Sequence, residues 1–146
     1  MKQAVIVSAA RTGLAKSFRG SFNMTHGATM GGHAVAAAVA RAGIEGAEIE
    51  DAIIGCGFPE GATGQNIARQ IAIRAGLPVT ASGMTVNRFC SSGLQSVALA
   101  AHQIMAEGAG PMVAGGVESI SMVQPGVKNA PDAWIAEHKP AIYMAM

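Results

Sequence analysis

The sequence predicts an α/β fold in which a mostly parallel sheet is flanked by helices. Short runs rich in β-branched residues alternate with Ala-rich segments of helical period, and glycine follows each helical segment. This alternation is typical of βαβ crossovers. The chain has 146 residues, the length of one ordinary domain, and it is 50% hydrophobic but only 4% aromatic. Such a composition suits helices packed closely against a sheet.

Four strands are expected from the apolar runs. Residues 4–8, AVIVS, have the pattern of a buried strand followed by a loop. The second strand covers residues 52–55 and ends in glycines, the third lies within residues 79–87, and the fourth covers residues 112–114. Because helical segments separate these runs, we expect them to lie parallel in one sheet with helices on both of its faces.

Three helices are expected, each closed by a glycine. They are residues 30–42 before Gly43, a helix carrying Ile67, Ile71 and Ala75 on one face before Gly76, and residues 90–108 ending at Gly108. Pro78 prevents the second helix from continuing. The third helix has an apolar stripe at helical spacing that consists of Leu94, Val97, Ala98, Ala101, Ile104 and Met105. We expect this stripe to face the sheet.

The overall charge and the N-terminus exclude several classes of protein. A net charge of +1 predicts no strong affinity for a phosphate backbone, so no nucleic-acid partner is expected. The first apolar run is too short and soon meets Arg11, which excludes a secretory leader or a membrane span at this point. We therefore expect a cytoplasmic protein with no membrane contact.

The two cysteines lie in different sequence contexts. Cys56 and Cys90 have no metal-ligand spacing, and a structural disulfide is not expected in a cytosolic chain, so we predict no metal site. Cys56 follows the second strand without a helix directly behind it. Free cysteine at such a position usually acts as a small core residue. We therefore predict a structural role for Cys56.

Cys90 stands where the third strand gives way to the third helix. The free N–H groups and the dipole at a helix N-terminus stabilise a thiolate placed there. The same groups, including the N–H of Cys90 itself, can donate to an oxyanion that forms when the thiolate attacks a carbonyl. Binding sites in open α/β sheets also gather at the carboxyl ends of strands. These arguments make Cys90 a candidate nucleophile, and a buried structural cysteine stays open as the alternative.

Four segments in register resemble one family. Residues 86–95, VNRFCSSGLQ, resemble the nucleophile motif of the thiolases, the acyltransferases that cleave or form 3-ketoacyl-CoA. Residues 4–13, 57–78 and 113–121 resemble the first strand and Arg-Thr loop, the second helical unit and the Gly-Gly-x-Glu-Ser segment of that family. The resemblance implies that Cys90 is the cysteine that accepts the acyl group. It also implies coenzyme A as a substrate, no permanently bound cofactor, and a homodimer or tetramer.

The resemblance also implies an incomplete catalytic centre. Thiolases consist of two similar βαβ-type halves, and the activating histidine and a second cysteine belong to the C-terminal half. We expect residues 1–121 to be an incomplete N-terminal half and residues 122–146 to begin an inserted loop region that is truncated at Met146. The chain would then be a piece of a longer thiolase, inactive alone and completed by a C-terminal half in the same or a companion chain.

The remaining polar residues have weaker claims. The four histidines are His26, His33, His102 and His138. His102 lies about 18 Å along the same helix from Cys90, too far to activate it. Glu118 is expected to satisfy nearby backbone amides, although a role in acid-base chemistry stays possible. The basic residues Arg11, Arg88 and Lys128 are expected to be solvated, and no CoA contact is assigned to them.

Two other functions remain open beside a thiolase. A ketoacyl synthase shares the fold and a cysteine in the N-terminal half, although the GGVESIS and ARTG segments favour a thiolase. A non-catalytic half that serves only in assembly is the third possibility. Within the thiolases, the segments NRFCSSGLQ and PEGATGQN look closer to 3-ketoacyl-CoA thiolases of broad chain length than to the acetoacetyl-CoA type.

Overall fold

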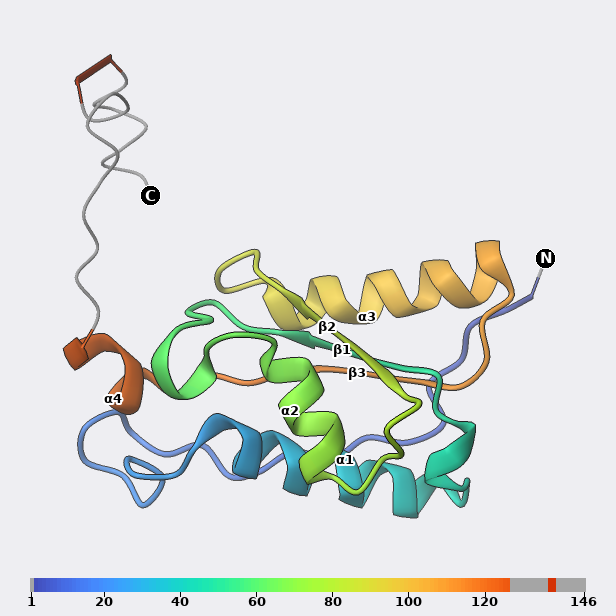
Figure 1. Cartoon of the computed structure of the whole chain (residues 1–146), viewed down its shortest axis with the longest axis horizontal. Coiled ribbons are helices and arrows are strands. Elements are labelled where there is room, and N and C mark those ends of the chain that lie inside the picture. The colour runs from blue at the N-terminus through green and yellow to red at the C-terminus, as the bar shows by residue number, and fades with distance from the viewer. Residues whose placement is uncertain (1, 127–136, 139–146) are drawn as a thin grey trace.

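The centre of the fold is a three-stranded parallel sheet (Figure 1). The computed structural model describes residues 2–126 and 137–138. The strands are β1 (Asp51–Gly55), β2 (Ser82–Val86) and β3 (Met112–Gly116), and their order in the sheet is β2-β1-β3. Both neighbours run parallel to β1, which confirms the predicted parallel sheet. The carboxyl ends of all three strands therefore meet at one edge.

Helices cover both faces of the sheet (Figure 1). α1 (Gly27–Ala42) and α2 (Ile67–Arg74) lie on one face, and α3 (Ser92–His102) lies on the other. α3 continues as one π-helical turn, Gln103–Glu107. The shorter elements are the 3₁₀ turns Gly46–Glu48, Gly61–Thr63 and Gln124–Gly126 and the single helical turn α4 (Ile120–Val123). The predicted α/β architecture is confirmed.

Glycine closes the helical segments where the sequence predicts it. Gly43 follows α1 with φ 68°, and Gly108 follows the π-helical turn after α3 with φ 77°. Residues with a Cβ seldom adopt this left-handed conformation, so glycine is favoured at the residue after a helix. The capping glycines thus fix where the chain turns back toward the next strand.

The main core lies between β1 and α2. Ala52 of β1 and Ile67 and Ile71 of α2 are completely buried in this core, and Ile54 of β1 is 3% exposed. The predicted spacing of Ile67 and Ile71 on one helical face is therefore confirmed. Cys56 directly follows β1 and is 1% exposed, so it belongs to the same core. This packing fixes the central strand β1 against α2, including its carboxyl end, where Cys56 is buried.

The predicted strand at residues 4–8 is wrong. Val5, Ile6 and Val7 are 73%, 80% and 71% exposed, and no strand in the described ranges pairs with them. An apolar groove of about 510 Å³ lies between this segment and β3, with α1 and α3 also lining it. A sheet needs neighbouring backbones about 4.8 Å apart. The segment lies across this groove from β3 and does not pair with it, although its sequence is typical of a buried strand.

The predicted apolar stripe of α3 is wrong at its first position. Leu94 is 75% exposed, and the buried residues of α3 are Ser92, Ser96 and Ala100. The sheet beneath carries glycine at Gly55 and Gly116, where the backbone of α3 comes too close for large side chains. The buried hydroxyl of Ser96 donates to the carbonyl oxygens of Gly93 and Gly115, both at 2.7 Å.

The boundary predicted between residues 121 and 122 falls inside α4. Most of the predicted loop region, residues 127–136 and 139–146, lies outside the described residues, as does Lys128. Across residues 2–126 and 137–138, no helix is long and apolar enough to cross a membrane.

Candidate active site

Cys90 lies at the edge of the sheet where the carboxyl ends of the strands meet. It is exposed, whereas Cys56 is buried. Its neighbours form a cavity of about 440 Å³ that opens between the ends of β1 and β3, the turn before α3 and the segment before α4. The cavity is lined by Gly55, Gly57, Phe58, Phe89, Cys90, Ser92, Gly93, Gly116, Val117, Glu118 and Ile120. Cys90 therefore lines an open cavity through which a ligand can reach its side chain.

The turn that carries Cys90 has a strained backbone. Phe89, directly before the cysteine, has φ 47°, which is uncommon for a residue with a side chain. The N–H of Ser91 donates to the carbonyl of Arg88 at 3.2 Å, and the N–H of Ser92 donates to the carbonyl of Phe89 at 3.0 Å. α3 therefore begins two residues later than predicted. The N–H groups of Ser91 and Ser92 are therefore paired within the turn and are not free donors.

Three glycines bring the N-terminus of α3 against the sheet. A Cβ on Gly55 would lie 2.2 Å from the carbonyl carbon of Ser92, and a Cβ on Gly116 would lie 3.2 Å from the Cα of Gly93. Backbone atoms of α3 therefore rest directly on the ends of β1 and β3. This close approach determines how far α3, and with it Cys90 just before the helix, lies from the ends of β1 and β3.

Glu118 holds the loop that forms the opposite wall of the cavity. Its carboxylate accepts hydrogen bonds from the N–H of Gly57 at 2.7 Å and from the N–H of Phe58 at 3.3 Å. The thiol of Cys56 also donates to it, at 3.6 Å. These bonds confirm the predicted structural role of Glu118. They tie the chain after β3 to the chain after β1.

Cys56 is not poised as a nucleophile. Burial, and then the negative charge of Glu118, raise the pKa of the Cys56 thiol from its ordinary value of 9.0 to about 11. The thiol therefore stays protonated at neutral pH, and its burial keeps reagents away. The predicted structural role of Cys56 is confirmed.

No histidine of residues 2–126 lines the Cys90 cavity. His26 has a role that the sequence did not reveal, because its Nδ1 accepts a hydrogen bond from the N–H of Ala28 at 3.1 Å and caps α1. His102 is the last residue of α3 and does not line the cavity. Within residues 2–126 the structure therefore places no histidine beside Cys90.

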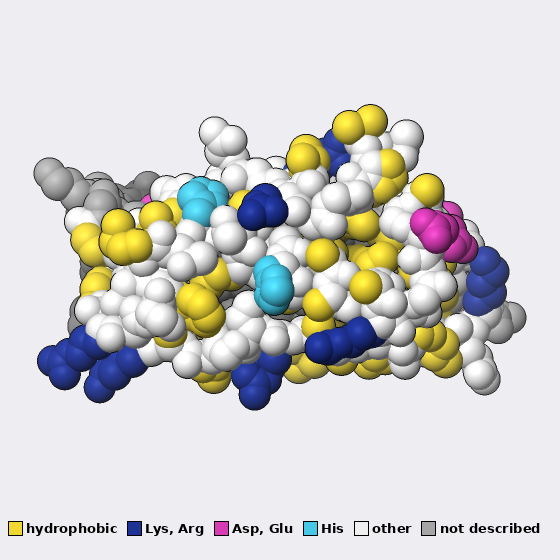
Figure 2. Space-filling view, turned by 90° about the horizontal axis from the view of Figure 1, so that it is seen from below, with side chains coloured by type: hydrophobic (Ala, Val, Ile, Leu, Met, Phe, Trp, Pro, Cys, Tyr) yellow, Lys and Arg dark blue, Asp and Glu magenta, His cyan; other side chains and the backbone are white. Residues whose placement is uncertain are grey.

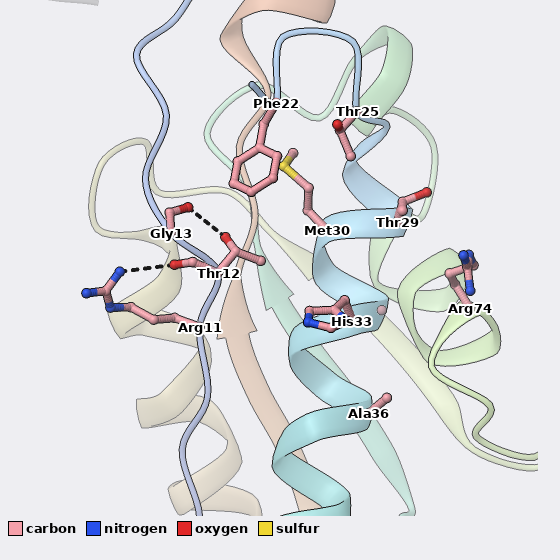
Figure 3. Close-up of a pocket in the computed structure, with 11 residues that line it drawn as sticks. Arg11, Thr12, Gly13, Phe22, Thr25, Thr29, Met30, His33, Ala36 and Arg74 are labelled. Atoms are coloured by element: carbon pink, nitrogen blue, oxygen red, sulfur yellow. Dashed lines mark hydrogen bonds between the residues drawn. The ribbon is translucent and has the colours of Figure 1, made fainter. Parts of the chain in front are cut away.

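A second cavity, of about 570 Å³, lies between α1 and the N-terminal segment (Figure 3). His33 faces it from α1, but Arg11 and Arg74 stand on opposite sides and do not converge. Arg11 donates to the carbonyl of Thr12 at 3.0 Å. The cavity therefore lacks the gathered cations that bind a phosphate group.

Charged side chains are scattered over the face that carries α1. Figure 2 shows Lys and Arg spread along this face rather than gathered in a patch. Arg88 lies two residues before Cys90 in the sequence, and its guanidinium donates to the side-chain oxygen of Gln95 at 2.6 Å. Among residues 2–126 and 137–138, no group of three His, Cys, Asp or Glu side chains could hold a metal ion.

The fold and the site define an α/β domain with an exposed cysteine at a strand-to-helix turn. The chain matches the family model described as "Thiolase, N-terminal domain" over residues 4–140. This match covers most of the chain, and the chain belongs to the thiolase family.

Named relatives agree with this assignment. The chain is 46% identical to the 3-ketoacyl-CoA thiolase of Bacillus subtilis (strain 168) in an alignment that covers 100% of this chain and 38% of the relative. It is 45% identical to the acetyl-CoA acetyltransferase of Escherichia coli (strain K12), with 84% of this chain and 30% of the relative covered. The mitochondrial acetyl-CoA acetyltransferase erg10A of Aspergillus fumigatus is 43% identical over 84% of this chain and 28% of its own length. The chain thus spans about a third of the length of these relatives.

Proposed function

We propose that this chain provides the nucleophilic cysteine of an acyltransferase of the thiolase type, with Cys90 as the residue that carries the acyl group. The single observation that carries the proposal is the position of Cys90, exposed on an open cavity at the carboxyl edge of the sheet in a chain of this family. Cys56, the other cysteine, is buried and protonated.

The reaction has two steps in the degradative direction. The Cys90 thiolate attacks the keto carbon of a 3-ketoacyl-CoA, and the bond between this carbon and the neighbouring methylene breaks. Acetyl-CoA leaves after its carbanion takes up a proton, and the shortened acyl group remains on the sulfur as a thioester. The thiol of a coenzyme A molecule then attacks this thioester, which releases the new acyl-CoA and the Cys90 thiol. Condensation of two acetyl-CoA molecules is the reverse sequence.

The structure of the turn supports a part of this chemistry. The N–H groups of Ser91 and Ser92 are paired inside the turn, so the N–H of Cys90 is the group that we propose as an oxyanion donor from this chain. The proton acceptor for the thiol is a separate requirement, since no histidine of residues 2–126 lines the cavity. We propose that a C-terminal half of the thiolase type supplies the base and a second cysteine.

Several finer assignments belong to the same proposal. Coenzyme A and acyl-CoA are the substrates, no cofactor is permanently bound, and residues 1–121 and 122–146 are the incomplete half and the start of the loop region. The enzyme is a cytoplasmic homodimer or tetramer. The relatives include both a 3-ketoacyl-CoA thiolase and acetyl-CoA acetyltransferases at nearly equal identity, so both substrate types enter the test.

The test uses the assembled enzyme, by which we mean this chain together with the C-terminal part that its longer relatives carry. It is mixed with acetoacetyl-CoA or a longer 3-ketoacyl-CoA and quenched in acid, and the acylated peptide is located by mass spectrometry. We expect the acyl group on Cys90, its loss in Cys90→Ala, and its retention in the control Cys56→Ala. Undiminished acylation of Cys90→Ala would refute the proposal. Thiolytic activity of the 146-residue chain alone would refute the need for the C-terminal half.

A further inference from the structure

The turn around Cys90 depends on one buried hydroxyl group. Ser92 is 3% exposed, and its Oγ takes part in two hydrogen bonds at once. It accepts from the N–H of Arg88 at 2.8 Å and donates to the carbonyl of Phe89 at 2.6 Å. The backbone N–H of Ser92 donates to the same carbonyl at 3.0 Å. The hydroxyl thus connects the residues on the β2 side of Cys90 to the first residue of α3.

These bonds act on the residue with the strained backbone. Phe89 has φ 47°, and its aromatic side chain is 57% exposed, so packing of the ring contributes little to keeping this conformation. A strained residue persists only where its surroundings determine it. The surroundings of Phe89 are the two bonds from Ser92 to its carbonyl and the bond from its N–H to the side-chain oxygen of Asn87 at 2.9 Å. Of these, the bond from the Ser92 hydroxyl is the shortest, at 2.6 Å. If Phe89 relaxed to a negative φ, the next residue, Cys90, would be turned to a new direction.

We propose that Ser92 is a positioning residue for the nucleophile: its hydroxyl holds Phe89 in the left-handed conformation and thereby keeps the sulfur of Cys90 directed at the cavity. This inference rests on the proposed function, because it assigns Ser92 to the acylation of Cys90. Ser92 does not act on the substrate itself. Its effect passes through the backbone of the turn.

Two other serines provide matched controls. Ser96, one turn later in α3, is completely buried, and its hydroxyl also donates to backbone carbonyls, those of Gly93 and Gly115. Ser91 is the neighbour of Ser92, but it is exposed, and its hydroxyl makes only a 3.3 Å bond to the carbonyl of Arg88. Ser96→Ala therefore reproduces the loss of a buried hydroxyl without altering the bonds to Phe89. Ser91→Ala reproduces the loss of a hydroxyl beside Cys90.

The experiment measures single-turnover acylation in the assembled enzyme, together with urea unfolding of each variant. We expect Ser92→Ala and Ser96→Ala to be destabilised to a similar extent. Only Ser92→Ala should acylate slowly, by about 10- to 100-fold at saturating acetoacetyl-CoA with KM unchanged, because a misplaced nucleophile loses rate rather than binding. Ser91→Ala and Ser96→Ala should stay within about 3-fold of the parent. Equal rates for Ser92→Ala and Ser96→Ala would overturn the inference.

A rescue experiment separates positioning from simple stability. Glycine adopts a positive φ without the cost that phenylalanine has. In a Phe89→Gly background, removal of the Ser92 hydroxyl should therefore slow acylation by no more than about 3-fold. The same large factor in both backgrounds would contradict the inference. If Ser92→Ala does not fold, the double variant should still fold and acylate at nearly the Phe89→Gly rate, and failure of the double variant would contradict the inference as well.

The outcome also separates this inference from the proposed function. Acylation that survives in Cys90→Ala refutes the function itself. Loss of acylation in Cys90→Ala, combined with a normal rate in Ser92→Ala, refutes only the role of Ser92.

Discussion

Replacing Gly55 by alanine tests how closely α3 must approach the sheet. The new Cβ would lie 2.2 Å and 2.3 Å from the carbonyl carbon and oxygen of Ser92 and 2.4 Å from the nitrogen of Gly93. Non-bonded carbon atoms are in contact at about 3.5–4.0 Å, so the first turn of α3 has to retreat by more than about 1 Å. The obstructing atoms are backbone and cannot change rotamer. The helix and the cysteine before it must therefore move together.

Both stability and rate should report this movement. Overpacking a close contact costs about 1–3 kcal/mol, and we expect Gly55→Ala to lose about 3 kcal/mol of unfolding free energy because the backbone has to shift. A displacement of about 1 Å at the reacting group costs about 100-fold in rate, so acylation of Cys90 should fall by that factor. Unfolding in urea followed by circular dichroism gives the first quantity. Single-turnover acylation of the assembled enzyme gives the second.

A neighbouring glycine provides the control for stability. A Cβ on Gly115 of β3 would have no atom within 4 Å, so Gly115→Ala in the 146-residue chain should stay within about 0.5 kcal/mol of the parent. If Gly55→Ala were as stable as Gly115→Ala and acylated at the parent rate, the close approach of α3 to β1 would not position Cys90. That result would refute the reasoning.

Two further predictions concern the wall of the cavity opposite Cys90. The pKa of Cys56 is 9.0 in its ordinary state and about 11 in the fold, so its contribution to stability is complete below pH 9 and is lost between pH 9 and 11. The free energy of unfolding should fall by about 1.4 kcal/mol per pH unit in this range. Urea unfolding at several pH values should find this fall in the parent and not in Cys56→Ala. The same fall in both proteins would show that Cys56 is not its source. Glu118→Gln offers one acceptor oxygen where the carboxylate offers two, which leaves the N–H of Gly57 or Phe58 without a partner at a cost of about 1–3 kcal/mol. Because the charge of Glu118 helps to raise the pKa of Cys56, thiolate absorbance in this variant should appear at lower pH than in the parent, and an unchanged titration would show that the charge has no effect.

Local patterns predicted most of the fold. Glycines after helices and apolar residues four apart identify α1 and α2, because both signals act within a few residues. The strand prediction for residues 4–8 was wrong because strand formation also depends on residues far away in the sequence. The β-branched sequence of this run fits a strand, but a strand forms only where another backbone pairs with it, and β3 lies across a groove.

The position of the candidate site could be predicted from the sequence, but the residues that hold Cys90 in place could not. The turn between strand and helix identified Cys90, since the end of one pattern and the start of the next are visible in the sequence. The left-handed Phe89 has no such signal, because phenylalanine seldom adopts this conformation. The role of Gly55 arises from contact between α3 and β1, which are distant in the sequence. The role of Ser92 is local, but it depends on the conformation of Phe89, which the sequence does not reveal.

The groove beside β3 also bears on how the chain behaves in solution. One wall is the edge of β3 with which no strand of the described residues pairs. The other wall is the exposed run at residues 4–8, which carries no charge and no proline. Uncharged, β-branched segments beside an unpaired strand edge are the usual starting points of intermolecular β-pairing. The 146-residue chain handled alone should therefore be prone to aggregation. A lysine in place of the exposed Ile6 is the substitution that would improve its solubility.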